Sequence, residues 1–320
     1  MKDSSTLTHF LKICEEEIDE NAAVVQKIKL PKINNSNVNV FLKREDLIHA
    51  TISGNKWRKL KYNLIEALIN RKSTLLTFGG AYSNHIHATA SACKIFGLKT
   101  IGIIRGEEHL PLNPTLKFAA ECGMQIFYVD RTTYRNKNKE SFITELHNRF
   151  GDFYLVPEGG TNNLAVKGCT EIINNINIKY DYILSACGTG GTISGLIAGL
   201  NGDKNIIGVP VLKGADFLNN DIDNLVKQYS YETFTNWHLN FDFHFGGYAK
   251  ITKELIFFIN QFEEINNIKL DPIYTGKLLF AVQTLINDNH FKENSTILVL
   301  HTGGLQGNMG MKNKMDKLLS

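Results

Sequence analysis

Short β-branched runs alternate with stretches of helical periodicity along most of the chain, and this alternation constrains the fold. In residues 55–70, for example, Leu60, Leu64 and Ala67 share one side of a helix. Strands that alternate with helices form right-handed βαβ units with parallel strands, and their ligands bind at the carboxyl ends of those strands. The sequence therefore predicts an α/β fold, with strands in 38–46, 74–78, 99–106, 125–130, 205–212 and 295–304, helices in 55–70, 88–96 and 114–123, and a strand, loop and helix within 180–200.

Size and composition indicate a folded protein of about two domains. Its 320 residues are 43% hydrophobic, 21% charged and 10% aromatic, close to the average for globular proteins. Intrinsic disorder, collagen and coiled coil are therefore excluded. No internal repeat or low-complexity linker interrupts the chain, so we expect the second domain to be inserted into the first rather than appended to it.

The charge is nearly balanced, with 35 Lys and Arg against 32 Asp and Glu and a net charge of +3. Because the sequence holds no basic block, nucleic-acid binding through a dense cationic face is not supported. The stretch 135–140, Arg-Asn-Lys-Asn-Lys-Glu, is interpreted as a solvated loop.

The cysteines favour a reducing compartment and give no sign of a metal site. They are odd in number and widely spaced, and they form no CxxC or Cys/His cluster, which argues against zinc and against a disulfide framework. The first 20 residues carry acids where an export signal needs an apolar core. We expect a cytoplasmic protein without a metal; its five cysteines are Cys14, Cys93, Cys122, Cys169 and Cys187.

One uncharged run, 183–200, has 18 residues, near the minimum length of a membrane span. Its five glycines and four Ser or Thr residues suit a ligand loop better than a lipid-facing helix. We therefore expect no contact with a membrane.

The strongest local signal is a glycine-rich loop between a strand that ends at Ala186 and a helix that begins at Ile193. Glycines let backbone amides approach an anion, and the following helix N-terminus supplies aligned N–H groups. The alternative is a tight turn that serves helix–sheet packing. The phosphate loop predicted here consists of Gly188, Thr189, Gly190, Gly191 and Thr192.

Two nucleotide motifs fail at this loop. A dinucleotide fingerprint needs glycine at its sixth position, where this chain has Ile193, and an acid at the end of the next strand, where it has Lys213. A P-loop is excluded too, because Gly276-Lys277 is preceded by Asp271 at the first glycine position and followed by Leu278. The compact phosphate of a small cofactor remains.

A lysine opens the predicted helix after the polar turn Ser53-Gly54-Asn55. The helix dipole is positive at this end, so it would lower the pKa of Lys56 and make the amine a better nucleophile. The alternative is that Lys56 joins Arg58, Lys59 and Lys61 on a solvated face.

A third loop, 79–85, again lies between a strand and a helix. Ser83 or Asn84 could be an ordinary N-cap, or the loop could hold a carboxylate on backbone amides with the Ser83 hydroxyl aimed at substrate. His85 and His87 have neither metal spacing nor a partner acid. Two further polar loops, 272–276 and 301–304, would each be interpreted alone as turns.

These loops belong to an ordered series of motifs that covers roughly residues 38 to 310: KREDL (43–47), SGNKWRKLKYNL (53–64), GGAYSNH (79–85), RGEEHLPLNPTL (105–116), PEGGTN (157–162), CGTGGTISGL (187–196), DPIYTGK (271–277) and HTGG (301–304). The series resembles the D-cysteine desulfhydrase and 1-aminocyclopropane-1-carboxylate (ACC) deaminase family. That family uses pyridoxal 5'-phosphate (PLP) and has the tryptophan-synthase β fold (fold type II). The resemblance therefore implies two three-layer α/β/α domains with largely parallel sheets and the cofactor between them.

The resemblance also implies roles for single residues. Lys56 would hold PLP as a Schiff base, which overturns the solvated-face interpretation, and its freed amine would then remove the α-proton of the substrate. Ser83 would be the nucleophile or acid–base group, and Tyr274 would pack near the pyridine ring and the substrate. The implied catalytic residues are Lys56, Ser83 and Tyr274; the substrate-binding residues are Ser83, Asn84, His85 and Tyr274.

The cofactor itself would be held at three points. Asn84 would bond its phenolic oxygen, the phosphate loop its phosphate, and the Thr302 hydroxyl its ring nitrogen, with Thr275 nearby. A neutral hydroxyl does not enforce a pyridinium as a carboxylate does, which favours elimination of a good leaving group. The implied cofactor-binding residues are Lys56, Asn84, Gly188, Thr189, Gly190, Gly191, Thr192, Tyr274, Thr275 and Thr302.

Thr275 and Thr302 also favour one substrate. ACC deaminases typically carry Glu and Leu at these two positions, whereas two threonines are the desulfhydrase pattern. We therefore predict elimination of D-cysteine to pyruvate, ammonia and hydrogen sulfide. The alternative is an ACC deaminase giving 2-oxobutanoate and ammonia, or a related D-amino-acid lyase acting on D-serine or β-chloro-D-alanine.

This chain departs from the family beside the expected substrate carboxylate. Tyr82 stands where many relatives have Gln, and Ile86-His87-Ala88 replaces Thr-Arg-Gln. Substrate identity is thus less constrained than cofactor identity. Outside this family, a non-catalytic binding protein is opposed by Lys56, and a nucleotide-dependent oxidoreductase by the failed motifs.

The resemblance implies a smaller α/β domain of residues 53–164 and a larger PLP-binding domain that combines 1–52 with 165–320. It also implies a homodimer. Partners are expected to be small D-amino-acid or amino-acid-like substrates, with no nucleic acid and no membrane.

Overall fold

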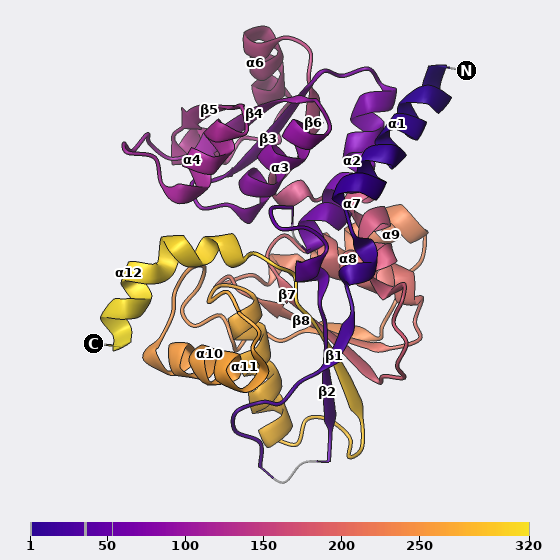
Figure 1. The fold of residues 1–320 in the computed structure, drawn as a ribbon, viewed down its shortest axis with the longest axis vertical. Coiled ribbons are helices and arrows are strands. Elements are labelled where there is room, and N and C mark those ends of the chain that lie inside the picture. Colours follow the sequence, from indigo (N-terminus) through magenta and orange to yellow (C-terminus); the bar gives the residue numbers. More distant parts are fainter. Residues whose placement is uncertain (1, 35–36, 53, 320) are drawn as a thin grey trace.

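Two largely parallel β-sheets organise the chain, as the alternation of strands and helices predicts (Figure 1). The computed structural model describes residues 2–34, 37–52 and 54–319, so Ser53 of the predicted polar turn lies outside the described residues. One sheet has the strand order β5-β4-β3-β6, and the other has the order β1-β2-β10-β7-β8-β9. Every neighbouring pair is parallel except β1 and β2.

The four-stranded sheet comes from the middle of the chain and is drawn in purple and magenta in Figure 1. The strands predicted in 74–78, 99–106 and 125–130 are confirmed as β3, β4 and β5, and the helices predicted in 88–96 and 114–123 as α3 and α4. The elements of this part are β3 (Thr74–Gly80), α3 (Asn84–Ile95), β4 (Lys99–Arg105), α4 (Pro114–Glu121), β5 (Met124–Val129), α5 (Arg131–Tyr134), α6 (Glu140–Phe150), β6 (Tyr154–Val156) and the short helix η3 (Glu158–Gly160).

The six-stranded sheet joins an N-terminal strand pair to the C-terminal half of the chain. The strands predicted in 38–46, 205–212 and 295–304 are confirmed, as is the strand, loop and helix within 180–200. Its elements are β1 (Val25–Lys27), β2 (Asn39–Lys43), β7 (Tyr182–Cys187), α8 (Gly191–Leu200), β8 (Asn205–Pro210), α9 (Phe217–Ser230), β9 (Trp237–Leu239), α10 (Lys253–Asn266), α11 (Thr275–Asn287), β10 (Thr296–Leu300), η5 (Leu305–Gly307) and α12 (Asn308–Leu319).

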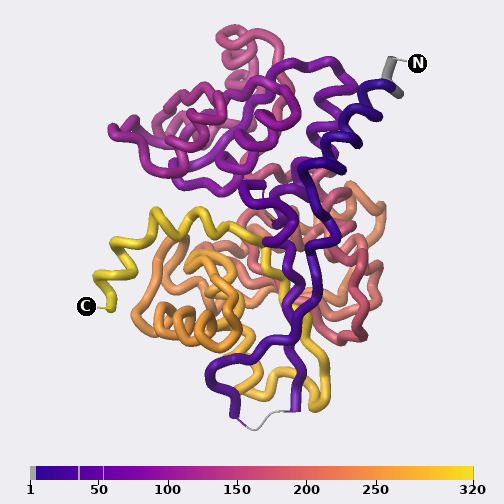
Figure 2. The backbone as a smooth tube through the Cα atoms, in the orientation of Figure 1, coloured from indigo at the N-terminus to yellow at the C-terminus, as the bar shows by residue number. Residues whose placement is uncertain are grey.

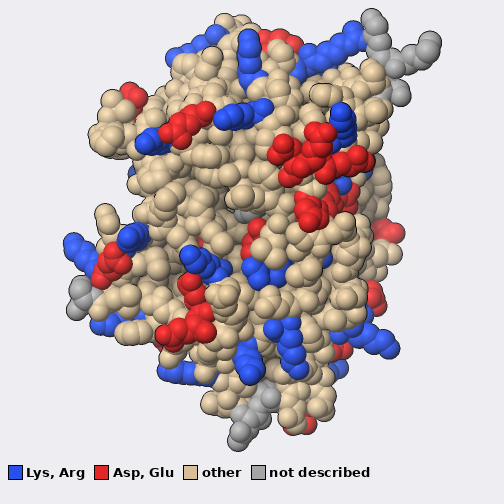
Figure 3. All heavy atoms as spheres, viewed as in Figure 1, with Lys and Arg blue, Asp and Glu red and all other residues tan. Residues whose placement is uncertain are grey.

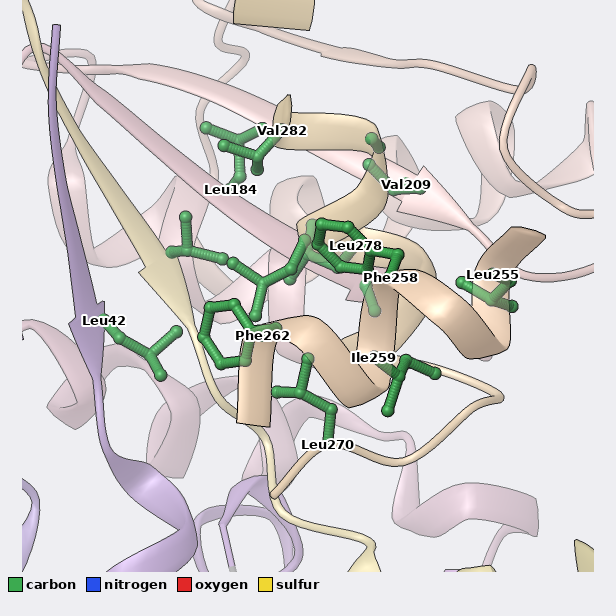
Figure 4. Packing of buried hydrophobic residues seen from close by; sticks show 14 of the residues in the cluster. Leu42, Leu184, Val209, Leu255, Phe258, Ile259, Phe262, Leu270, Leu278 and Val282 are labelled. Atoms are coloured by element: carbon green, nitrogen blue, oxygen red, sulfur yellow. The ribbon is translucent and has the colours of Figure 1, made fainter. Parts of the chain in front are cut away.

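Both faces of this sheet are buried. Successive residues of one strand enter different hydrophobic clusters: Ile183 packs with α8 and α9, whereas Leu184 packs with α10 and α11. Figure 4 shows the second cluster, in which Phe258 and Phe262 project from α10 toward the strands. Helices on both faces explain why the strands are apolar throughout rather than alternating. The predicted α/β class is confirmed.

The remaining elements connect the two sheets. They are α1 (Lys2–Glu17), η1 (Glu20–Ala22), η2 (Glu45–Leu47), α2 (Asn55–Ile69), α7 (Asn163–Thr170) and η4 (Glu171–Ile173). Helix α1 packs beside α2, where Phe10 stacks on Trp57 and on Phe96, the residue that follows α3. The helix thus shares a hydrophobic cluster with β3. The division into 53–164 and 1–52 with 165–320 stays a prediction.

The chain's ends and its uncharged run are also placed. The tube in Figure 2 leaves both described ends at the periphery, far from each other. No helix among the described residues is long and apolar enough to cross a membrane. The uncharged run 183–200 is divided between β7, the phosphate loop and α8.

Helices α2, α7 and α8 pack at backbone contact through two glycines. A Cβ on Gly168 of α7 would lie 1.8 Å from the carbonyl oxygen of Arg58 on α2. A Cβ on Gly195 of α8 would lie 2.2 Å from the Cβ of Cys169 on α7. Larger side chains at either position would push the helices apart. This three-helix contact therefore fixes the start of α2 relative to the phosphate loop.

We expect Gly168→Ala to lower the free energy of unfolding by at least about 2 kcal/mol, because overpacking a rigid contact forces the backbone to move. The matched control is Gly199→Ala on α8, whose Cβ would lie 3.2 Å from Thr170, and a smaller loss is expected there. Urea unfolding followed by circular dichroism measures both. Equal stability of Gly168→Ala and the unmodified chain would contradict the close packing.

Candidate functional site

A cavity of about 930 Å³ is lined by loops from both sheets. These loops follow the carboxyl ends of β3, β7 and β10, the edge where parallel sheets bind ligands. The structure brings most of the predicted residues together there. Those that line the cavity are Lys56, Ser83, Asn84, His85, Gly188, Thr189, Gly190, Gly191, Thr192, Tyr274 and Thr302; Thr275 does not line it.

Lys56 lies in the first turn of α2, as predicted, with its amine 3.0 Å from the Asn55 side-chain oxygen. Desolvation lowers the pKa of the Lys56 amine to about 8, partly opposed by Cys169 and Asp271. Gly54 precedes the helix with φ +66°, and a Cβ there would lie 2.1 Å from the Thr302 carbonyl oxygen. Only glycine allows this approach. The loop 301–304 therefore lies directly against the start of α2.

The predicted phosphate loop follows β7 and leads into α8, as expected, and its binding of a phosphate stays a prediction. Gly190 has φ +78° and precedes α8, whose N-terminus faces the cavity. The Thr192 hydroxyl accepts a hydrogen bond of 2.8 Å from the Asn55 amide. Glycines elsewhere in the loop are tightly enclosed, since a Cβ on Gly188 would lie 3.3 Å from the Tyr274 ring. The turn thus serves packing and leaves room for an anion at the same time.

Lys59 joins this loop and was missed at the sequence level, where it was assigned to a possible solvated face. It is 2% exposed, and its amine donates to Thr161 at 2.8 Å and to Thr189 at 3.2 Å. Desolvation, and then the charge of Lys56, lower the pKa of Lys59 to about 7. No carboxylate within the described ranges pairs with it. A phosphate bound at this loop would supply the missing negative charge.

The solvated-face interpretation of this helix start is wrong for a second residue. Arg58 is 3% exposed and is bonded to Glu45 at 2.9 Å and to Glu20. Lys61 is half-buried between Glu20 and Glu171, at 3.0 and 2.7 Å. The signal was available: Lys56 and Lys59 are three residues apart and share one helix face.

Ser83, Asn84 and His85 begin α3 at the cavity wall. The Ser83 hydroxyl is the N-cap and accepts from the Ile86 amide at 3.3 Å, and the Asn84 side-chain oxygen accepts from Gln306. His85 is buried between Thr77, at 2.7 Å, and Thr89. Burial, with the charges of Lys59 and Lys56, holds the pKa of His85 well below its usual value, so the imidazole is neutral.

Tyr274 and Thr275 are oriented by one carboxylate. Asp271 accepts the backbone N–H groups of Tyr274 at 2.7 Å and Thr275 at 2.9 Å. The Thr275 hydroxyl also donates to Asp271, at 2.6 Å, so it points away from the cavity. Burial and the neighbouring Tyr248 raise the pKa of Tyr274 well above its usual value. Tyr248 lines the cavity and was missed, although it follows two glycines in a polar loop.

The two departures from the family pattern have different positions. Tyr82 lines the cavity and lies against α12, since a Cβ on Gly310 would be 2.6 Å from its ring. His87 does not line the cavity; it stacks on Phe118 at 4.0 Å. Only Tyr82 is therefore placed to influence a ligand directly.

These groups fit a small phosphorylated aldehyde. An amine of lowered pKa, Lys56, lies in the same cavity as an anion cradle that contains an unpaired cation, Lys59. No group of three or more His, Cys, Asp or Glu in the part of the chain that the structure describes could hold a metal ion.

Comparisons with known proteins agree with this chemistry. A family model described as pyridoxal-phosphate dependent enzyme matches residues 21–303. A protein of Pyrococcus abyssi with the provisional name ACC deaminase is 31% identical over 305 residues, which cover 91% of this chain and 92% of that protein. The mitochondrial bifunctional D-cysteine desulfhydrase/ACC deaminase of Arabidopsis thaliana is 28% identical over 322 residues, covering 92% and 79%.

A solved structure extends the likeness to three dimensions. The crystal structure of an ACC deaminase homologue matches with a TM-score of 0.81 and 28% identity, and it covers 97% of this chain and 98% of that one. The predicted fold class is confirmed by this match.

We expect the cofactor-free protein to become more stable as the pH rises through the titration of Lys59. Its folded pKa of about 7 lies below the usual 10.5, so the unfolded chain binds more protons between these values. Relative to Lys59→Met, the unmodified chain should gain up to about 1.4 kcal/mol per pH unit across this window.

Urea unfolding of both proteins at several pH values measures this difference. The exposed Lys94→Met controls for loss of one lysine. A difference between the unmodified chain and Lys59→Met that does not change with pH would contradict the buried, uncompensated amine.

Proposed function

Because the chain belongs to the family of pyridoxal-phosphate dependent enzymes, we propose that it eliminates hydrogen sulfide from D-cysteine, giving pyruvate and ammonia. The cofactor is PLP, as the sequence predicts, and the resemblance to D-cysteine desulfhydrases and ACC deaminases is confirmed by the names of the relatives. The observation that carries the choice of D-cysteine is Thr302, a neutral hydroxyl in the cavity wall against the start of α2.

Lys56 is proposed as the residue that carries the cofactor and moves the α-proton. Bound PLP delocalises the negative charge that develops at the substrate α-carbon when that proton leaves. With a pKa of about 8, the Lys56 amine is partly unprotonated near neutral pH and can accept a proton. Loss of the thiolate from the β-carbon then completes the elimination, and water releases pyruvate and ammonia.

The start of α3 is proposed to hold the substrate carboxylate. A helix N-terminus favours an anion, and the backbone N–H groups of this turn, rather than the neutral His85, would supply the attraction. Ser83 lies at the same turn, with its hydroxyl beside the cavity. Asn84 is proposed to bond the phenolic oxygen of the cofactor, and its orientation is supported by the hydrogen bond from Gln306.

Tyr274 is proposed to position the leaving group. Its raised pKa keeps the phenol protonated at neutral pH, so it can donate a hydrogen bond toward sulfur or the ring. The contact with Tyr248, whose ring centroid lies 6.2 Å away, orients it.

Deamination of ACC is the second candidate, because the Pyrococcus abyssi relative carries that name. The argument from Thr275 is weaker than the argument from Thr302, since the Thr275 hydroxyl is bound by Asp271 outside the cavity. The homodimer, the cytoplasmic location and the Schiff base at Lys56 stay predictions.

The activity is tested by incubating PLP-loaded protein in parallel with D-cysteine, L-cysteine and ACC, while sulfide, ammonia and the 2-oxoacid are assayed. We expect sulfide and pyruvate from D-cysteine alone. Lys56→Ala should lose the visible absorbance of the bound cofactor and reduce sulfide release by at least about 100-fold, whereas the exposed Lys94→Ala should change neither. Formation of 2-oxobutanoate from ACC would promote the second candidate.

Thr302→Leu is expected to lower kcat/KM for D-cysteine about tenfold, the equivalent of one lost hydrogen bond, and to raise the ratio of ACC to D-cysteine turnover. Thr275→Val is the matched control, because that hydroxyl bonds Asp271 rather than the cavity. It should reduce thermal stability and leave the substrate ratio unchanged. If Thr275→Val changes the ratio of ACC to D-cysteine turnover and Thr302→Leu does not, Thr275 rather than Thr302 determines the substrate.

A further inference from the structure

A second hollow of about 300 Å³ opens beside the cofactor cavity. Four of the residues that line it also line the main cavity, so the two spaces are continuous. The hollow is lined by Arg105, Arg131, Tyr134, Arg135, Lys137 and Glu158.

The hollow carries an excess of positive charge. Its one carboxylate, Glu158, pairs with Lys137 at 3.2 Å. No acid among the described residues lies within salt-bridge distance of the three arginines, which are exposed at its wall. On the face that Figure 3 shows, acidic side chains gather at the upper right and lysines and arginines are spread over other parts. Three uncompensated guanidinium groups around one hollow favour an anion.

A buried tyrosine also lines the hollow. Tyr134 is 2% exposed, and burial and the neighbouring Glu158 carboxylate, toward which its phenol donates, raise its pKa above the usual range. Arg105 and Lys137 lie over its ring, at 5.7 and 5.1 Å. Glu158 is thus engaged by Lys137 and Tyr134, and the three arginines are left without an acid among the described residues.

This arrangement explains a stretch that the sequence analysis assigned to solvent. Residues 135–140 follow α5 at the carboxyl edge of the four-stranded sheet, next to the end of β4 at Arg105. Arg135, Asn138, Lys139 and Glu140 are exposed, in keeping with a solvated loop, and Lys137 and Asn138 also line the main cavity. Strands β4 and β5 pair in parallel, with Arg105 opposite Val129. Because α5 follows β5, this pairing brings Arg105 near Arg131 and Arg135.

We propose that this hollow binds a second anionic group, a phosphate, sulfonate or carboxylate, at the side-chain end of the amino-acid substrate. The inference rests on the proposed function, which places the carboxylate of the amino-acid substrate at the start of α3. The hollow adjoins the loop proposed to hold the substrate carboxylate, because a Cβ on Gly80 would lie 3.7 Å from the Arg105 guanidinium. Besides D-cysteine, amino acids whose side chain ends in an anion should therefore bind at this site.

Two unreactive ligands test the proposal by binding rather than turnover: D-2-amino-3-phosphonopropanoate and D-alanine, which differ by the phosphonate. Isothermal titration of the PLP-loaded enzyme gives both dissociation constants at fixed ionic strength. We expect the phosphonate to bind at least about tenfold more tightly, as charge-assisted hydrogen bonds predict. The double variant Arg131→Gln/Arg135→Gln should abolish that advantage and leave D-alanine binding unchanged.

Arg71→Gln is the matched control, because it removes an exposed arginine before β3, at the opposite end of that strand from Gly80. It should keep the phosphonate advantage, as should an Arg131→Lys/Arg135→Lys variant in large part.

Equal affinity for the two ligands would overturn the proposal. Inorganic phosphate is a further probe. If phosphate binds together with D-alanine in an arginine-dependent way, while the phosphonate binds no more tightly than D-alanine, the hollow holds a free anion. That result would also overturn the proposal. Failure of the proposed function is separable: it would appear as absence of sulfide from D-cysteine, a measurement that does not enter the ratio of the two dissociation constants.

Discussion

The site depends on the backbone contact of α2, α7 and α8. Gly168 and Gly195 allow these helices to approach more closely than any side chain would permit, and Gly54 allows the loop 301–304 to lie against the start of α2. Loops from distant parts of the sequence therefore meet at fixed positions around Lys56. Catalysis requires reacting groups at fixed positions, because a small displacement of one group lowers the reaction rate strongly.

The same packing desolvates two amines. Lys56 and Lys59 are buried in one helix start, and the charge of Lys56 also disfavours the charged form of Lys59. An anion bound beside Lys59 would compensate its charge. Arg58 shows the contrasting solution, in which the protein supplies its own acids, Glu45 and Glu20. Lys59, which has no acid partner among the described residues, lines the cavity, whereas Arg58 is buried beside its two acids and does not line it.

Much of the fold could be predicted from the sequence, because strand and helix periodicity is local. The phosphate loop and Lys56 were placed correctly in the cavity for the same reason. The spacing of Lys56 and Lys59 indicates that they share a helix face, but the residues that bury Lys59, Thr161 and Thr189, follow 102 and 130 residues later. The direction of the Thr275 hydroxyl depends on Asp271, and Arg131 and Arg135 meet Arg105 only through the pairing of β4 with β5. The sequence pattern shows neither the direction of a side chain nor the residues from distant parts of the chain that bury it.

Gln306 has a consequence for how molecules reach the cavity. Its amide joins Asn84 and, at 3.0 Å, the hydroxyl of Thr115, so the segment before α12 is tied to both α3 and α4. Tyr82 lies against Gly310 on the same side. This rim is closed by direct contacts between the two halves of the molecule. An incoming ligand therefore cannot pass between α3 and the segment before α12 unless these contacts break.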